Sequence, residues 1–201
     1  AATVLQLNST STGGTSLRIQ NSGTDKMYMG LAADFIVGQS SNLTDSAIRA
    51  NGGLIIATGG GNEKLRIDSS GRILKGIQTA RGNYANNTSG VQFGFQIEAT
   101  SGTDSTLSII RSSNDANDGG IFIGKTRSTS VGGNTVVQAG DDLGTITFGG
   151  ADGTSLQFGA QIIAEVQSGV GNDDMPTDLI FKTNGGSTSN TERLRITSTG
   201  Q

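Results

Sequence analysis

A short string, Leu-Arg-Ile followed by three residues and then Gly, occurs three times in this chain of 201 residues. The copies occupy residues 17–23, 65–71 and 194–200. Before each of the last two copies stand an apolar run and a Gly-rich loop, at residues 54–61 and 179–186. A strand, a turn, a second strand and a Gly stop predict a β-hairpin that the chain uses repeatedly. The copies are unevenly spaced, which argues against a regular solenoid and favours an elongated structural protein.

Alternation of apolar and polar residues predicts further strands outside the repeat. Residues 91–98 and 160–167 alternate with period two, and we expect one buried and one wet face on each, with Ala160, Ile162, Ala164 and Val166 on one face of the second. No window of eleven or more residues carries a capped helical period, so we predict an all-β chain with Gly-rich turns and less than about 10% helix.

Within the repeat, the same alternation assigns side chains to faces. Leu65 and Ile67 share one face of the predicted strand, and Lys64 and Arg66 line the other. Glu63 falls on the apolar face by this count. We therefore expect Glu63 at the open end of the strand.

The composition limits how much core one chain can build. Apolar residues make up 33% of the sequence and aromatic residues 4%, with no Trp. Such a chain has little material for a thick core of its own, so we expect it to complete its burial against other chains.

Charge and cysteine content exclude several functional classes. The net charge is −3 and the pI near 4.8, with Lys and Arg scattered singly, so we predict no nucleic-acid partner. No apolar run approaches the ~20 residues that span a bilayer, and we predict no membrane insertion. Without Cys there are no disulfides and no thiolate metal sites.

One stretch without a sustained apolar period divides the chain. We predict an N-terminal β module at residues 1–75, a joint at 76–90 and a C-terminal β module at 91–201. Ala1 opens directly into a strand pattern and Gln201 follows the Gly of a repeat. This favours a segment of a longer polypeptide.

Residues able to support catalysis are few. The absence of His and Cys excludes Ser-His-Asp and Cys-His arrangements. Asp141 with Asp142, and Asp173 with Asp174, are candidate glycosidase-type carboxylate pairs. Both pairs sit in turn-forming sequence. Asp is common in turns because its side chain hydrogen-bonds to the nearby backbone. We predict no catalytic residues.

Metal and cofactor sites are likewise not indicated. Residues 115–119 and 172–174 carry oxygen ligands but match no recognised calcium loop. Residues 59–64 are Gly-rich but lack the Lys-Ser/Thr ending and helix of a phosphate loop, so we expect a hairpin turn. No cofactor is predicted.

The arginine of each repeat leaves two alternatives open. Arg18, Arg66 and Arg195 either form a solvated outward face or meet a carboxylate or carbonyl of a neighbouring chain.

The last repeat also resembles a known family. Residues 192–200, preceded by 178–183, are similar to the hairpin that recurs in fibre proteins of tailed bacteriophages, especially marine and cyanobacterial phages. Residues 124–129, 140–154 and 171–176 resemble further elements of one such module, in the same order. The resemblance covers residues 72–201 well and residues 1–71 more loosely.

This resemblance implies a homotrimeric, needle-like shaft on the virion, made of β-prism-like or β-sandwich-like modules. Such a shaft would bind other tail, baseplate or capsid proteins and support host attachment. The alternatives are an adhesin module that contacts host surface glycan and, less favoured, a tailspike-type polysaccharide hydrolase. The residues expected to pack in the trimer are Leu17, Ile19, Leu65, Ile67, Leu194 and Ile196.

Overall fold

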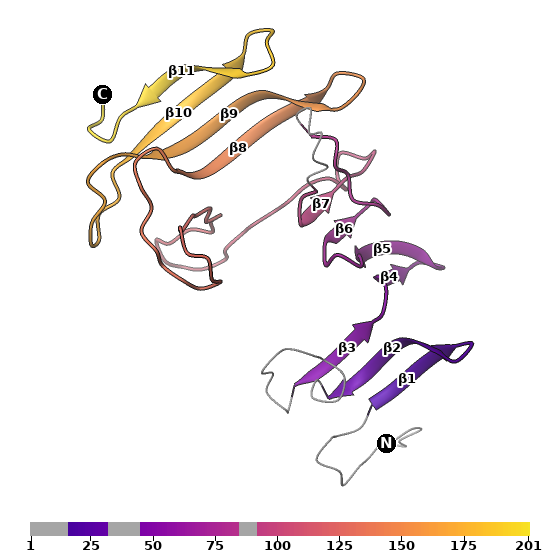
Figure 1. Ribbon diagram of the computed structural model, residues 1–201. Coiled ribbons are helices and arrows are strands. Elements are labelled where there is room, and N and C mark those ends of the chain that lie inside the picture. Colours follow the sequence, from indigo (N-terminus) through magenta and orange to yellow (C-terminus); the bar gives the residue numbers. More distant parts are fainter. Residues whose placement is uncertain (1–15, 32–44, 85–91) are drawn as a thin grey trace. The chain divides into compact units, whose positions relative to one another are not determined.

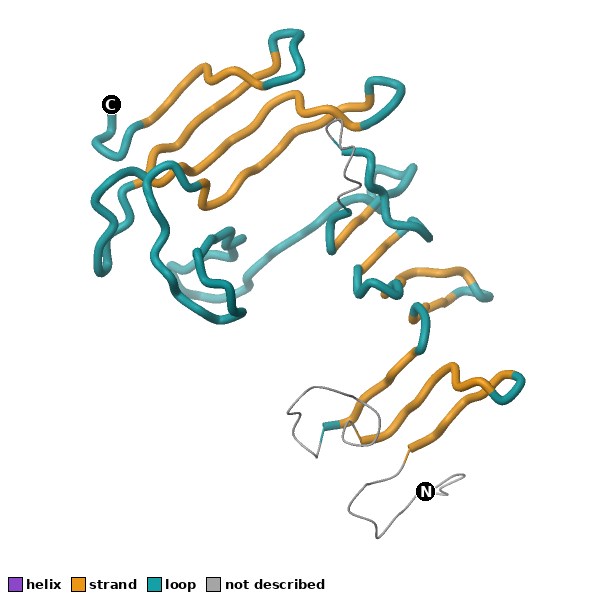
Figure 2. Tube along the Cα trace, viewed as in Figure 1, coloured by secondary structure: helices purple, strands orange, loops and turns teal. Residues whose placement is uncertain are grey.

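The computed structural model describes residues 16–31, 45–84 and 92–201. The described residues form strands and connecting loops and contain no helix, as Figure 2 shows. The strands belong to three separate sheets, of three, four and four strands. The predicted all-β class is therefore confirmed.

The chain divides into two compact units. One gathers the described residues up to Ala80 together with Gln92–Thr106, and the other holds residues 81–84 and Leu107–Gln201. The chain thus passes from the first unit into the second, returns to the first and then enters the second again. The division into modules 1–75 and 91–201 with a joint at 76–90 stays a prediction.

The first sheet belongs to the first unit and contains the first repeat. Its order is β1 (Ser16–Asn21), β2 (Thr24–Leu31) and β3 (Ser46–Ala50), and both pairs are antiparallel. Ser22 and Gly23 join β1 to β2, and both have positive φ angles. Two positive φ angles in a two-residue loop match the twist of the flanking strands, which is why Gly stands here.

The second sheet, also in the first unit, contains the second repeat. Its order is β4 (Leu54–Thr58), β5 (Asn62–Ile67), β6 (Ile73–Lys75) and β7 (Phe95–Ile97). The pairs are antiparallel except that β7 runs parallel to β6. Gly76 follows β6 with a φ of 82°, and a side chain there would collide with the backbone carbonyl of Glu98. Only Gly permits this close approach.

The second unit holds the third sheet and the last repeat (Figure 1). Strands β8 (Asp142–Ala151), β9 (Leu156–Val166), β10 (Thr177–Asn184) and β11 (Asn190–Ile196) form an antiparallel meander in that order. Ile163 of β9 and Ile180 of β10 are direct neighbours, and both are buried. They form the centre of this unit's small core.

Two strand predictions need correction. In β9 the buried residue Ile163 lies on the face opposite the one predicted to be buried. On the predicted face, Val166 is buried but Ile162 is only half-buried, so the described residues leave most of that face uncovered. Of the strand expected at 91–98, residue 91 lies outside the described residues. Within 92–98 the strand is limited to Phe95–Ile97, because its parallel partner β6 is only three residues long.

Candidate functional site

Each of the three sheets presents one apolar face to solvent. In the first sheet, Leu17 lies beside Met29, which lies beside Ile48, so all three share a face. Ile19 and Met27 pair one step further along the same face. Leu17, Ile19, Met29 and Ile48 are all exposed. The other face carries Tyr28.

The second sheet repeats this arrangement. Leu65 pairs with Ile56, and Ile67 pairs with Ile73, which in turn lies beside Phe95. Ile56, Ile67, Ile73 and Phe95 are exposed and Leu65 is half-buried. A continuous row of apolar side chains thus crosses all four strands without cover from the described residues.

The third sheet has the largest such face. Its strand register places seven large apolar side chains on one side. We call them the apolar face of the β8–β11 sheet: Ile146, Phe148, Ile162, Leu179, Phe181, Leu194 and Ile196. Five of the seven are exposed and the other two, Ile162 and Phe181, are half-buried. Isolated exposed apolar residues are ordinary, but contiguous patches mark interaction sites.

The repeat therefore places its Leu and Ile on an exposed apolar face in every sheet. The six residues in question are Leu17, Ile19, Leu65, Ile67, Leu194 and Ile196. Leu65 is half-buried and the other five are exposed. Their packing in a trimer stays a prediction.

A β-bulge places the Glu and the Arg of the last two repeats on the same face. In the β4–β5 hairpin, Ile56 pairs with Leu65 and Ala57 with Glu63, so Lys64 is an extra residue. The extra residue reverses the alternation and brings Glu63 and Arg66 onto the same face. Arg66 Nη2 lies 2.6 Å from Glu63 Oε2. The expectation that Glu63 lies on the apolar face is therefore wrong, because a plain alternation count ignores the bulge.

The β10–β11 hairpin has the same bulge in the same place. Phe181 pairs with Leu194 and Lys182 with Glu192, which leaves Arg193 as the extra residue. Arg195 Nη2 lies 2.8 Å from Glu192 Oε2.

Arg195 also reaches two further carboxylates of its own chain. Its Nη1 lies 2.8 Å from Asp178 Oδ2 and 2.9 Å from Glu165 Oε1. Asp178 is 5% exposed and accepts a second bond from the backbone N–H of Ser198. Hydrogen bonds from Arg195 lower the pKa of Asp178 and of Glu192, and these carboxylates raise the pKa of Arg195. The network joins β9, β10 and β11 on one face.

The arginines of the last two repeats have partners that neither alternative named. Arg66 and Arg195 are bound by carboxylates of their own chain, and contact with a neighbouring chain stays a prediction. Arg18 is mostly exposed, and its Nε lies 3.5 Å from Asp25 Oδ1.

The first candidate catalytic carboxylate, Asp141, has a structural role. It receives hydrogen bonds from Arg127 and Lys125 and from the backbone N–H of Gln138. These bonds, chiefly those from Arg127, hold the pKa of Asp141 well below its usual range. Its neighbour Asp142 is an exposed residue at the start of β8.

The other carboxylate candidates lie in turns. Asp173 has a φ of 58°, and Asp174 closes the turn through paired backbone bonds to Gly171. Asp115, in a candidate calcium loop, accepts hydrogen bonds from Arg111, Ser113 and the N–H of Asn117. Arg111 is the main cause that lowers the pKa of Asp115 to about 2.

Residues 16–31, 45–84 and 92–201 contain no cluster of three or more Asp and Glu side chains arranged to hold a metal. The same ranges contain no helix of the length and apolarity that crossing a bilayer requires. The Gly-rich stretch at 59–61 is the turn between β4 and β5, as predicted, and all three glycines have positive φ angles.

Sequence reasoning missed one apolar segment, at residues 107–126. It contains two apolar runs, 107–110, which is interrupted by Ser108, and 121–123. Neither run forms a strand. The alternation of Leu107 with Ile109, and of Ile121 with Ile123, is the signal that could have marked it.

Comparison with known proteins gives a relationship at the level of the fold. The sequence matches no family model and no curated protein. The fold, however, is similar to the solved carboxy-terminal domain of the bacteriophage T5 L-shaped tail fibre. The TM-score is 0.55 at 15% sequence identity, and the match covers 94% of this chain and 76% of that one.

A second solved structure of the same T5 domain includes its intramolecular chaperone domain. The TM-score and identity are the same, and the match covers 53% of that longer chain. At this level of identity the comparison establishes a shared fold. It agrees with the resemblance to phage fibres drawn from the sequence.

Proposed function

We propose that this chain is a segment of a bacteriophage tail fibre, carried on the virion, that supports host attachment as a non-enzymatic structural element. One observation carries the proposal. Each sheet of a tail-fibre-like fold presents an apolar face, and the repeated Leu and Ile residues lie on all three faces. A fibre made of several copies would cover these faces.

The assembly we propose is a homotrimer. A closed symmetric oligomer brings identical patches together around one axis, which suits a repeated apolar motif. The resemblance to phage fibres favours three copies. In the trimer, the apolar faces turn inward and the Glu–Arg pairs of the repeats lie on the opposite faces.

The further partners in this proposal are neighbouring tail, baseplate or capsid proteins and, at the cell, host surface polysaccharide.

A structural role is supported by the way the candidate carboxylates are used. Asp141 and Asp115 are held by Arg127 and Arg111 and by backbone N–H groups, so they fix loops.

Labelling of intact virions tests this function. Antibodies raised against the chain, followed by gold labelling and electron microscopy, should mark the tail fibres of the phage that encodes it. Particles preincubated with the same antibodies should adsorb to host cells more slowly, and antibodies first absorbed with purified chain should have no effect. Label confined to the capsid shell, with unchanged adsorption, would contradict the proposal.

A further inference from the structure

Residues 107–126 form two apolar arms joined by a polar turn. The first arm spans 107–110 and the second 121–123, and every large apolar residue in them is exposed. Ile110 is 84% exposed and Phe122 96%. The turn between the arms is closed by Arg111, whose two terminal nitrogens each lie 2.6 Å from an oxygen of Asp115.

The backbone of this segment lacks the pairing its composition demands. No backbone–backbone hydrogen bond joins residues 107–126 to any other residue the structure describes. Apolar residues occupy successive positions, as in Ile109–Ile110 and 121–123, so both sides of an extended arm are apolar. Strands of that kind are normally buried on both faces. Once such an arm is buried, its unpaired backbone groups need a strand partner.

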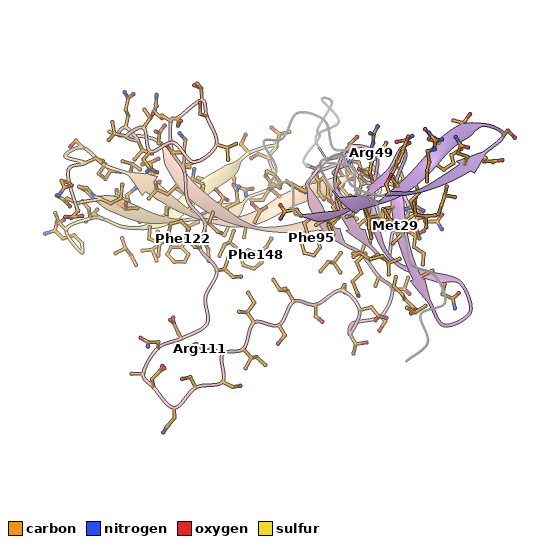
Figure 3. All side chains as sticks on the ribbon, turned by 90° about the horizontal axis from the view of Figure 1, so that it is seen from below. Met29, Arg49, Phe95, Arg111, Phe122 and Phe148 are labelled. Carbon is orange, nitrogen blue, oxygen red and sulfur yellow. The ribbon has the colours of Figure 1, made fainter. Side chains whose placement is uncertain are left out.

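The segment is anchored at one end to the apolar face of the β8–β11 sheet. Ile123 lies against Gly144 of β8, in the space that a side chain at Gly144 would occupy. Arg127, which follows the segment, is bound to Asp141. Figure 3 shows Phe122 and Phe148 projecting on the same side of this sheet, while the turn with Arg111 lies away from it.

The two arms are separated by an apolar space. A hollow of about 250 Å³ is lined by Leu107, Ile109, Gly119, Gly120 and Ile121. The two sides of the segment lie close together at Gly119, where an added side chain would lie 3.5 Å from the backbone nitrogen of Arg111.

We propose that residues 107–126 are a strand-exchange segment whose arms pair with the same segments of neighbouring copies. This inference rests on the proposed trimer. A second copy is the favoured occupant because the segment continues the apolar face that the trimer covers. The two arms differ in sequence, so the first arm of each copy can pair with the second arm of the next copy. Three such pairings close into a ring around a three-fold axis. The copies then interlock as well as pack.

Hydrogen exchange tests the pairing directly. In the assembled protein, amides of residues 107–110 and 121–123 should be protected about a hundredfold or more over an unstructured peptide. In the Ile196→Asp variant, which should separate the copies, this protection should disappear while the amides of β9 and β10 keep theirs. Protection that persists in separated copies would mean pairing within one chain and would overturn the inference.

A cross-linking experiment covers the case in which that variant does not fold. A photoreactive phenylalanine analogue at position 122 should give products of two and three chains on a denaturing gel. The same analogue at Ser187, in the β10–β11 turn, serves as the exposed control and should give far less. A trimer by sedimentation with unprotected arms and no cross-link from position 122 would overturn this inference but leave the proposed fibre intact. A folded monomer would overturn both.

Discussion

Glu192 and Arg195 stand three residues apart in one β-strand and yet lie on the same face, with Arg195 Nη2 2.8 Å from Glu192 Oε2. Strict alternation would put them on opposite faces. The extra residue Arg193 reverses the alternation between them. Lys64 does the same between Glu63 and Arg66. In both repeats the bulge puts the Glu–Arg pair on the face opposite the repeated Leu and Ile.

The bulge can be tested by removing its extra residue. Deletion of Arg193 should shift Glu192 to the apolar face and break its pair with Arg195, because the alternation would become regular. The thermal midpoint of the chain should fall by several degrees. Arg193→Ala keeps the residue count and should change the midpoint little. Equal effects of the deletion and the substitution would show that the bulge itself is unimportant.

Acid should weaken the Arg195 network in a defined direction. The pKa values of Asp178 and Glu192 lie below their ordinary values of 3.8 and 4.5 in the folded chain. The stabilisation is therefore complete above the ordinary values and is lost as the pH falls through the lowered ones. Unfolding midpoints measured from neutral pH down to about pH 2 should show this loss.

The control is a matched pair of variants. Arg195→Gln should flatten the acid dependence because both carboxylates lose their cation, and Arg193→Gln should leave it unchanged. If both variants keep the wild-type slope, the network does not contribute to stability.

The predicted assembly faces can be separated from the core of the single chain. Ile196 is 44% exposed in one chain and Ile180 is 0% exposed. Ile196→Asp should release single copies, because three charges would be buried together, while changing the unfolding free energy of one copy by about 0.5 kcal/mol or less. Ile180→Ala should instead cost each copy about 2–5 kcal/mol. Sedimentation and denaturant unfolding of both variants give the comparison, and a still trimeric Ile196→Asp would remove this face from the interface.

The turn carboxylates should have no catalytic role. Purified chain should leave host polysaccharide at its original length, and the combined Asn variant of Asp141, Asp142, Asp173 and Asp174 should behave identically. Chromatography of the polysaccharide by size provides the measurement. Degradation by the parent chain that disappears in a variant of unchanged mass would support the tailspike alternative.

Removal of divalent ions should leave the fold unaffected. The Asp115 carboxylate is occupied by Arg111, Ser113 and the N–H of Asn117. A chelator should therefore not change the thermal midpoint, and readdition of calcium should not raise it. A midpoint that falls with chelator and recovers with calcium would reveal a metal site.

Much of the fold could be predicted from local patterns. The repeated hairpins and the all-β class follow from alternation and Gly positions, as at Gly59–Gly61, because turn conformation is a local property. The bulges could not be located from alternation alone, so the prediction put Glu63 on the wrong face of its strand. Ile163 was missed because its burial depends on Ile180, a partner in another strand.

The candidate site was only partly visible in the sequence. The repeat pointed to Leu194 and Ile196, which do lie on an exposed apolar face. Their neighbours Ile146 and Phe148 come from a distant strand, and only the register places them on the same face. The arms at 107–126 were not singled out in the sequence, and the structure alone shows that no backbone hydrogen bond pairs them with another described residue.

Sedimentation equilibrium of the purified chain tests the central claim most directly. We predict a single species of about 60 kDa, three times the 20.5 kDa of one chain, across a wide concentration range. A folded species of 20.5 kDa with cooperative unfolding would contradict the account, because the apolar faces would then be stable in water without a partner.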